Sequence, residues 1–206
     1  MLTKTLTRKK LASLIIIVVV VISAVSVWLM YPRGAQTITL KDDFEDGLDS
    51  WTTDAEVPEN PNNPGQNVTW TIGLTPYENS NSENHSVLFA IDGGQGDGAI
   101  WIERKLSLQP YDAVKNISVT FRLWSEDESF NTIAAVIGYV GNRNPSSEDY
   151  FHVLGVANQV AGWKTYTFNS EVTVDSDLNA YVALGIAVRW ETTMEYYVDD
   201  VEIVVM

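Results

Sequence analysis

Cysteine is absent from the 206 residues of the chain, which excludes disulfide bonds, cysteine-based zinc sites and thiol nucleophiles. Basic residues are scarce after residue 34, where eight Lys and Arg stand against all 27 Asp and Glu of the chain, a formal charge of −19. A domain with this charge repels phosphate polymers, so nucleic acid is not expected as a partner.

Long runs with helical periodicity are also lacking after Thr37. Short runs of β-branched and aromatic residues alternate instead with clusters of Gly, Asn, Asp, Pro and Ser. Ten strands are predicted, at residues 37–44, 68–72, 86–91, 99–106, 116–124, 132–140, 151–156, 163–168, 181–190 and 195–205. This number of strands in one domain predicts an all-β fold, a two-sheet antiparallel sandwich or jelly roll.

One long hydrophobic run is present, at residues 11–30, and it contains no charged residue. Its length is enough for a helix to cross the roughly 30 Å of hydrocarbon in a bilayer. The basic residues Arg8, Lys9 and Lys10 precede it, which places the N-terminus in the cytoplasm. We therefore expect a single-pass protein of the cell membrane, with a cytoplasmic segment (1–10), a transmembrane anchor (11–30), a linker (31–36) and an extracytoplasmic domain (37–206).

A cleaved signal peptide is the alternative for the same segment, because a basic start, an apolar stretch and small residues such as Ser23 and Ala24 are present. The run is longer than the apolar region of a usual signal peptide, and Arg33 occupies the −3 position relative to Ala35. Both interpretations place the domain outside the cell.

Carboxylates cluster at both ends of the predicted sandwich, in the segment DDFED at 42–46 and at Asp199 and Asp200. Terminal strands often lie side by side in a sandwich, and Ca²⁺ prefers such oxygen ligands. The candidate ligands of a structural Ca²⁺ are Asp43, Glu45, Asp199 and Asp200. The alternative is a surface of solvated acids in which Asp199 is hydrogen-bonded to the backbone.

Strand alternation sharpens the prediction for Asp199, because it places this residue on the same face as Val201 and Ile203. A carboxylate that points toward a core needs a compensating partner, which a cation would provide.

Aromatic residues are the second candidate functional group, since exposed aromatic rings stack on the C–H faces of sugars. Trp51, Trp70 and Tyr77 adjoin loops rich in Pro and Asn, and Trp124 precedes an acidic run, so these four are predicted ligand platforms. Trp101 and Trp163 lie in apolar strand patterns and are predicted to belong to the core.

Four segments resemble the pattern of jelly-roll carbohydrate-binding modules that accompany polysaccharide-degrading enzymes: DDFEDGLDSW (42–51), GAIWIERKL (98–106), GWKTYTF (162–168) and YYVDDVEI (196–203). The resemblance implies a β-sandwich with a structural calcium near the chain ends, at Glu45 and Asp199. Such modules normally stand beside a catalytic domain, whereas here we expect a free-standing surface protein.

Catalysis is not expected, because His85 and His152 lack a recognisable partner motif and acidic pairs such as Glu126/Glu128 have no distinctive spacing. The predicted function is binding of carbohydrate or a cell-envelope polymer without catalysis. The alternative is a structural cell-surface or filament subunit that assembles by protein-protein contacts.

Overall fold

The computed structural model describes residues 37–76, 85–92, 98–110, 113–127, 134–189 and 193–206. Within these residues no helix has the length and apolar character needed to cross a bilayer. The predicted anchor at 11–30 lies outside the described residues, together with the segments 1–10 and 31–36.

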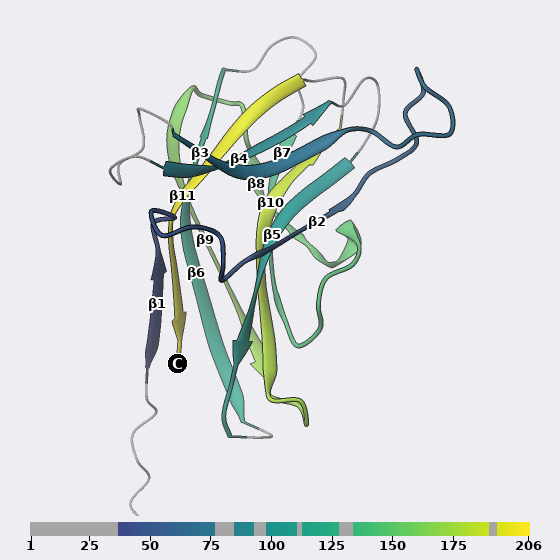
Figure 1. Ribbon diagram of the computed structural model, residues 1–206. Coiled ribbons are helices and arrows are strands. Elements are labelled where there is room, and N and C mark those ends of the chain that lie inside the picture. Colours follow the sequence, from purple (N-terminus) through teal and green to yellow (C-terminus); the bar gives the residue numbers. More distant parts are fainter. Residues whose placement is uncertain (1–36, 77–84, 93–97, 111–112, 128–133, 190–192) are drawn as a thin grey trace, which may run out of the picture. The chain divides into compact units, whose positions relative to one another are not determined.

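The described residues form eleven β-strands and one short 3₁₀ helix (Figure 1). In chain order these are β1 (Ile38–Asp42), β2 (Thr52–Glu56), β3 (Trp70–Pro76), β4 (His85–Asp92), β5 (Gly98–Ser107), β6 (Val114–Ser125), β7 (Ala134–Gly141), η1 (Glu148–Tyr150), β8 (His152–Val156), β9 (Gly162–Thr173), β10 (Asn179–Val188) and β11 (Thr193–Val205). The ten predicted strands are confirmed. The eleventh, β2, has the polar sequence TTDAE, which gives no apolar alternation.

The strands form two antiparallel sheets, which confirms the predicted sandwich. Sheet A has the order β3-β4-β11-β6-β9, with β1 also paired to β11, and sheet B has the order β2-β5-β10-β7-β8. Among the described strands, only β3 and β4 and then β7 and β8 follow one another in the same sheet, so the chain passes between the sheets at most steps. This wrapping is typical of a jelly roll.

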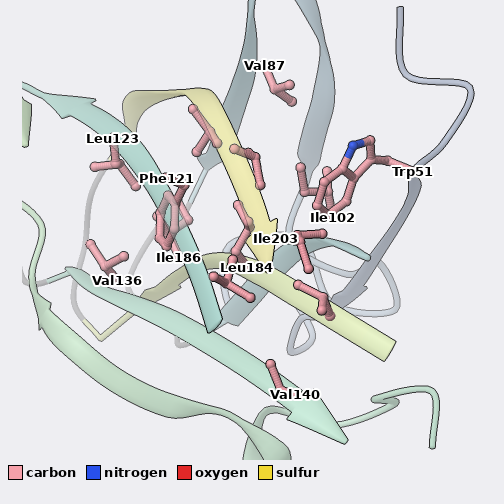
Figure 2. Close-up of a cluster of buried hydrophobic side chains, with 14 of the residues drawn as sticks. Trp51, Val87, Ile102, Phe121, Leu123, Val136, Val140, Leu184, Ile186 and Ile203 are labelled. Atoms are coloured by element: carbon pink, nitrogen blue, oxygen red, sulfur yellow. The ribbon is translucent and has the colours of Figure 1, made fainter. Parts of the chain in front are cut away.

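The core lies between the two sheets and is built from alternate residues of each long strand. Figure 2 shows Phe121 and Ile203 of sheet A close to Leu184 and Ile186 of sheet B, and all four are at most 1% exposed. Burial of each such side chain stabilises the fold by about 1.5–3 kcal/mol relative to leaving it exposed. The described part of residues 37–206 thus contains a hydrophobic core of its own.

Strand β11 has two partners along one edge, because its first half pairs with β4 and its last residues pair with β1. A β-bulge between Asp199 and Glu202 separates the two halves, and Asp200 has a φ of 51° there. The extra residue shifts the alternation, so that Val198 and Val201 both face the core. The prediction that Asp199 shares a face with Val201 is therefore wrong, since Asp199 pairs with Arg122, on the side of sheet A away from the core.

Gly185 lies in the central strand of sheet B, beside β5. A Cβ atom at this position would lie 2.1 Å from the backbone oxygen of Ile100 and 2.7 Å from the Cα of Trp101. Because both neighbouring atoms are backbone, a side chain here would force β10 and β5 apart.

The substitution Gly185→Ala is therefore expected to lower the free energy of unfolding by about 2–3 kcal/mol, as overpacking does in other cores. Urea denaturation of the fragment 37–206 measures this change. The matched control is Gly73→Ala in β3, where a Cβ would meet no atom within 4 Å, and its stability should stay within about 1 kcal/mol of the parent. Equal effects of the two substitutions would contradict the packing argument.

Candidate functional site

The outer face of sheet B, on the side away from the core, has an aromatic and apolar cluster where a solvent-facing sheet would normally have polar residues. Trp101 of β5 is fully buried there and Tyr139 of β7 is 8% exposed. Between them, β10 contributes the small residues Ala183, Gly185 and Ala187, and its Tyr181 packs against the cluster farther along the strand. The two large rings therefore stand on either side of a low central strand.

A loop of the chain's own sequence, residues 142–151 and here named the strap, lies against this cluster. Phe151 lies with its ring centroid 5.0 Å from that of Trp101 and 5.9 Å from that of Tyr139. The Tyr139 hydroxyl donates to the backbone oxygen of Arg143 at 2.9 Å. Burial raises the pKa of Tyr139, and the bond to Arg143 offsets part of this effect.

The far end of the strap is fixed by polar contacts with two other elements. The backbone N–H of Glu148 donates to Oε2 of Glu56 at 2.6 Å, and the Glu148 carboxylate forms an ion pair with Arg189. The strap is thus attached to β2, to β7 and to the residue after β10.

An open groove of about 390 Å³ lies beside the strap, and its lining combines carboxylates with small polar and apolar groups. The lining residues are Glu56, Val57, Pro58, Gly98, Ser147, Glu148 and Asp149. Tyr150 follows directly in the strap, is 42% exposed and stands edge to face with Tyr139 at 6.1 Å. The strap thus carries carboxylates that line the groove and, in the next position, an exposed aromatic ring; we name the groove the strap groove.

Glu103 is a buried carboxylate at the edge of the same cluster, with an exposed fraction of 6%. Its two oxygens accept hydrogen bonds from Nε1 of Trp101 at 3.2 Å and from the Thr52 hydroxyl at 3.1 Å. These bonds satisfy the carboxylate and fix the orientation of the Trp101 ring.

The outer face of sheet A carries a second, smaller aromatic group. Trp124 stands edge to face with Tyr197 at 5.5 Å, and the guanidinium of Arg122 lies over the ring of Trp163 at 5.2 Å. Trp124 and Trp163 are cross-strand neighbours and both are half-buried. The prediction that Trp163 belongs to the core is therefore wrong, because its half-buried ring lies on the outer face of sheet A. Trp101 is buried as predicted, in the cluster on the outer face of sheet B.

Of the predicted ligand platforms, Trp51 is 6% exposed and packs in the core (Figure 2). Its Nε1 donates to Oδ2 of Asp42 at 2.8 Å, and Arg104 lies over its ring at 5.8 Å. Trp51 is therefore a structural residue and does not fit the platform prediction. Trp70 is half-buried against the core, and Tyr77 lies outside the described residues.

The predicted metal ligands lie where β1, β4 and β11 meet. Glu45 reaches the start of β4, accepting from the backbone N–H of His85 at 2.8 Å and lying 3.0 Å from its Nδ1. Ser86 follows, and its buried hydroxyl has no hydrogen-bond partner among the described residues. Asp199 is 1% exposed and follows Val198, the partner of Val87. The buried Asp199 carboxylate on β11 and the unsatisfied Ser86 hydroxyl on β4 thus belong to neighbouring strands, and Glu45 is hydrogen-bonded to the residue before Ser86.

The other two predicted ligands, Asp43 and Asp200, line an open pocket of about 430 Å³ between the end of β1 and the bulge of β11. Asp43 is exposed and accepts from the backbone N–H of Glu45 at 3.3 Å, and Asp200 forms an ion pair with Arg122 at 3.4 Å. Within the part of the chain that the structure describes, no three acidic or His side chains gather as a metal cluster. A cation here would need hydroxyl or backbone oxygens in addition to Glu45 and Asp199.

Lys164 organises the segment between β8 and β9, which sequence reasoning missed. Its Nζ donates to the Ser125 hydroxyl at 2.7 Å and to the backbone oxygens of Ala157 and Val160. Burial lowers the pKa of Lys164, and the charge of Asp127 offsets part of this effect. Alternation along β9 would have placed this lysine on the inner side, opposite to the direction of Trp163.

Tyr196 supports the same segment from sheet A. Its fully buried hydroxyl donates to Oδ1 of Asn158 at 3.0 Å, and burial raises the pKa of Tyr196 far above its usual range.

No protein-family model and no curated protein sequence matches the chain. Its fold does match solved structures. A cleaved adhesin domain of Lys-gingipain from Porphyromonas gingivalis matches with a TM-score of 0.51 and 17% identity, covering 81% of this chain and 97% of that one. The N-terminal tandem of two CBM22 domains from Paenibacillus barcinonensis matches with a TM-score of 0.51 and 18% identity, covering 81% of this chain and 50% of that one.

A further match, at a TM-score of 0.48 and 11% identity, is a CBM61 domain in complex with β-1,4-galactotriose, covering 78% of this chain and 92% of that one. At these identities the two matches with a TM-score of 0.51 show the fold alone. The domain therefore has the β-sandwich fold that occurs in carbohydrate-binding modules, which confirms the resemblance noted in the four sequence segments.

Proposed function

We propose that residues 37–206 bind carbohydrate, a glycan or cell-envelope polymer, without catalysing its hydrolysis, and that the binding site is the strap groove with Tyr150. The observation that supports this proposal is the exposed ring of Tyr150, which directly follows Asp149 of the carboxylate-lined groove. The fold shared with carbohydrate-binding modules is consistent with it.

The chemistry of the groove suits a sugar. An exposed ring such as Tyr150 offers a face to the C–H groups of a pyranose, and the oxygens of Glu56, Glu148 and Asp149 accept hydrogen bonds from its hydroxyls. The charge of −19 after residue 34 favours neutral glycans over anionic ones.

Binding without hydrolysis fits the bonding of the groove carboxylates. Glu56 accepts the backbone N–H of Glu148, and Glu148 itself is paired with Arg189. These groups hold the strap in place, whereas a hydrolase needs one carboxyl available as a proton donor.

The substitution Tyr150→Ala in the fragment 37–206 is expected to weaken retention on the preferred polysaccharide by about tenfold, the usual order for loss of one stacked ring. Affinity electrophoresis against a panel of neutral and anionic polysaccharides measures this effect. The matched controls are Trp124→Ala on the outer face of sheet A and Trp70→Ala beside the core.

Retention that survives Tyr150→Ala and disappears with Trp124→Ala or Trp70→Ala would move the site to one of the residues predicted from sequence. An absence of retention by every polysaccharide would remove the carbohydrate proposal.

We also propose that a structural Ca²⁺ binds where β1, β4 and β11 meet. Glu45 and Asp199 would hold it, with the Ser86 hydroxyl and backbone oxygens completing an oxygen set of the kind that Ca²⁺ prefers. The buried Asp199 carboxylate and the unsatisfied Ser86 hydroxyl support this placement. The ion would neutralise the carboxylates that gather where the first and last strands pair.

Chelation by EGTA is accordingly expected to lower the melting temperature of the fragment by about 5–10 °C, since an ion that binds only the native state stabilises it by mass action. Differential scanning calorimetry with added CaCl₂ or EGTA measures the shift. Asp199→Ala should abolish the difference, and Asp46→Ala, an exposed acid of the same segment, should keep it. A melting temperature that does not respond to EGTA would exclude the ion.

We further propose that residues 11–30 anchor the domain in the cell membrane, with the N-terminus in the cytoplasm. The uncharged run and the basic residues before it support this topology. The linker at 31–36 is short, so the domain would stand close to the bilayer.

The lack of cysteine makes the topology directly testable. In intact cells, a membrane-impermeant maleimide should label the exposed Ser107→Cys variant of the full chain, because the domain faces outward. The Thr5→Cys variant should react only after the cells are permeabilised. The reverse pattern of labelling would contradict the proposed orientation.

A further inference from the structure

Strand β8 forms one of the two edges of sheet B, and its surface differs from the rest of the domain. We propose that this edge is a self-association surface, on which β8 of a second copy of the chain pairs antiparallel with β8 of the first. Three observations indicate that the partner is a second copy of the chain: the exposed apolar side chains of this edge, its lack of charge and its unpaired backbone.

Exposed apolar side chains concentrate at this edge. The described residues contain eight large hydrophobic side chains that are exposed, and three of them fall within residues 153–160. They are Val153 (64%), Val156 (41%) and Val160 (63%). A cluster of this kind on a soluble surface usually marks a contact with another molecule.

Charge selects a second copy as the partner. Residues 150–163 contain no Asp, Glu, Lys or Arg, within a domain whose formal charge after residue 34 is −19. Two copies repel one another through their acidic surfaces, so they approach most readily through a neutral one. A basic partner would instead be attracted to the acidic remainder of the surface and gain nothing from this edge.

The backbone of β8 is complementary to itself. In the described part of the chain β8 pairs only with β7, so its other edge presents N–H and C=O groups to the surroundings. A two-fold axis perpendicular to the sheet brings two such edges together antiparallel, and each donor then meets an acceptor.

The other sheet edges are protected in the ways that natural edge strands usually are. Strand β2 contains Asp54 and Glu56, and β9 contains Lys164 and Glu171. Strand β3 ends at Pro76, which has no N–H to donate. Strand β8 has none of these residues, although a register irregularity opposite Val136 and Ile137 bends its pairing with β7.

The edge is also held in place before any partner arrives. Phe151 packs on Trp101 at its start, Leu154 packs against the core at its centre, and Lys164 binds the backbone oxygens of Ala157 and Val160 beyond its end. Pairing therefore costs little ordering entropy.

Sedimentation equilibrium of the fragment 37–206, which contains its own core, should show a reversible dimer that grows with protein concentration. Val153→Asp should lower the association constant at least about tenfold, because it places like charges at a symmetric apolar contact. The matched control is Val114→Asp, which changes a valine of almost equal exposure, 61%, at the start of β6 and should leave the dimer intact. Circular dichroism establishes that both variants are folded.

The full chain in native membranes gives a second measurement. A bismaleimide crosslinker should join two copies of the Val153→Cys variant and should not join copies of the Val114→Cys variant. A fragment that stays monomeric at every concentration, or a dimer that both aspartate variants weaken equally, would overturn the proposal. Open filaments in place of dimers would also overturn it, because an edge that pairs with itself closes after two copies.

Discussion

The arrangement of the domain depends on the pairing of β11 with three other strands. One edge of β11 pairs with β6 along most of its length, whereas the opposite edge is shared by β4 and β1, which arrive end to end. The bulge at Asp199 and Asp200 lies where the partner changes, and it lets Val198 and Val201 both reach the core. The first and last strands of the sandwich are thereby joined, and the acidic segment after β1 is brought to β4 through Glu45 and His85. The fold itself produces this concentration of negative charge.

Alternation in the sequence was sufficient to predict the class of fold, because β4, β6 and β11 each bury one face and expose the other to varying degrees. It failed for β2, an edge strand whose polar residues make backbone hydrogen bonds but contribute little to the core. It also failed for the face of Asp199, since a bulge inserts one residue without changing the pattern of residue types. The neighbouring strands determine where a bulge of this kind forms, and the sequence of one strand alone contains no information about its neighbours.

The candidate site was harder to predict than the fold for a related reason. In β5 the run GAIWI is apolar at every position because one side faces the core and the other is covered by Phe151 of the strap. The sequence of β5 predicts burial of Trp101 correctly but does not distinguish the two faces. For Trp51 the error has the opposite sign, because the polar loop beside it in the sequence predicted an exposed ring. The ring is instead buried, with a hydrogen bond to Asp42 and Arg104 over its face. Proximity to a loop in sequence therefore says little about whether a ring is exposed.

The two proposals for sheet B reinforce one another geometrically. A two-fold axis perpendicular to the sheet, as the pairing of β8 with itself requires, leaves the outer faces of both copies on the same side of one continuous sheet. The strap groove is lined by the strap and by residues at the ends of β2 and β5, so a dimer paired through β8 would carry one groove on each side of the shared edge, available to a single long polymer chain. Linking two weak sites in this way raises the overall affinity without any new contact to the sugar, provided that the spacing of the grooves matches the repeat of the polymer. A site built from one exposed ring and a few carboxylates is expected to be weak alone, and pairing through an uncharged edge would compensate for that weakness while the acidic surface keeps other copies apart.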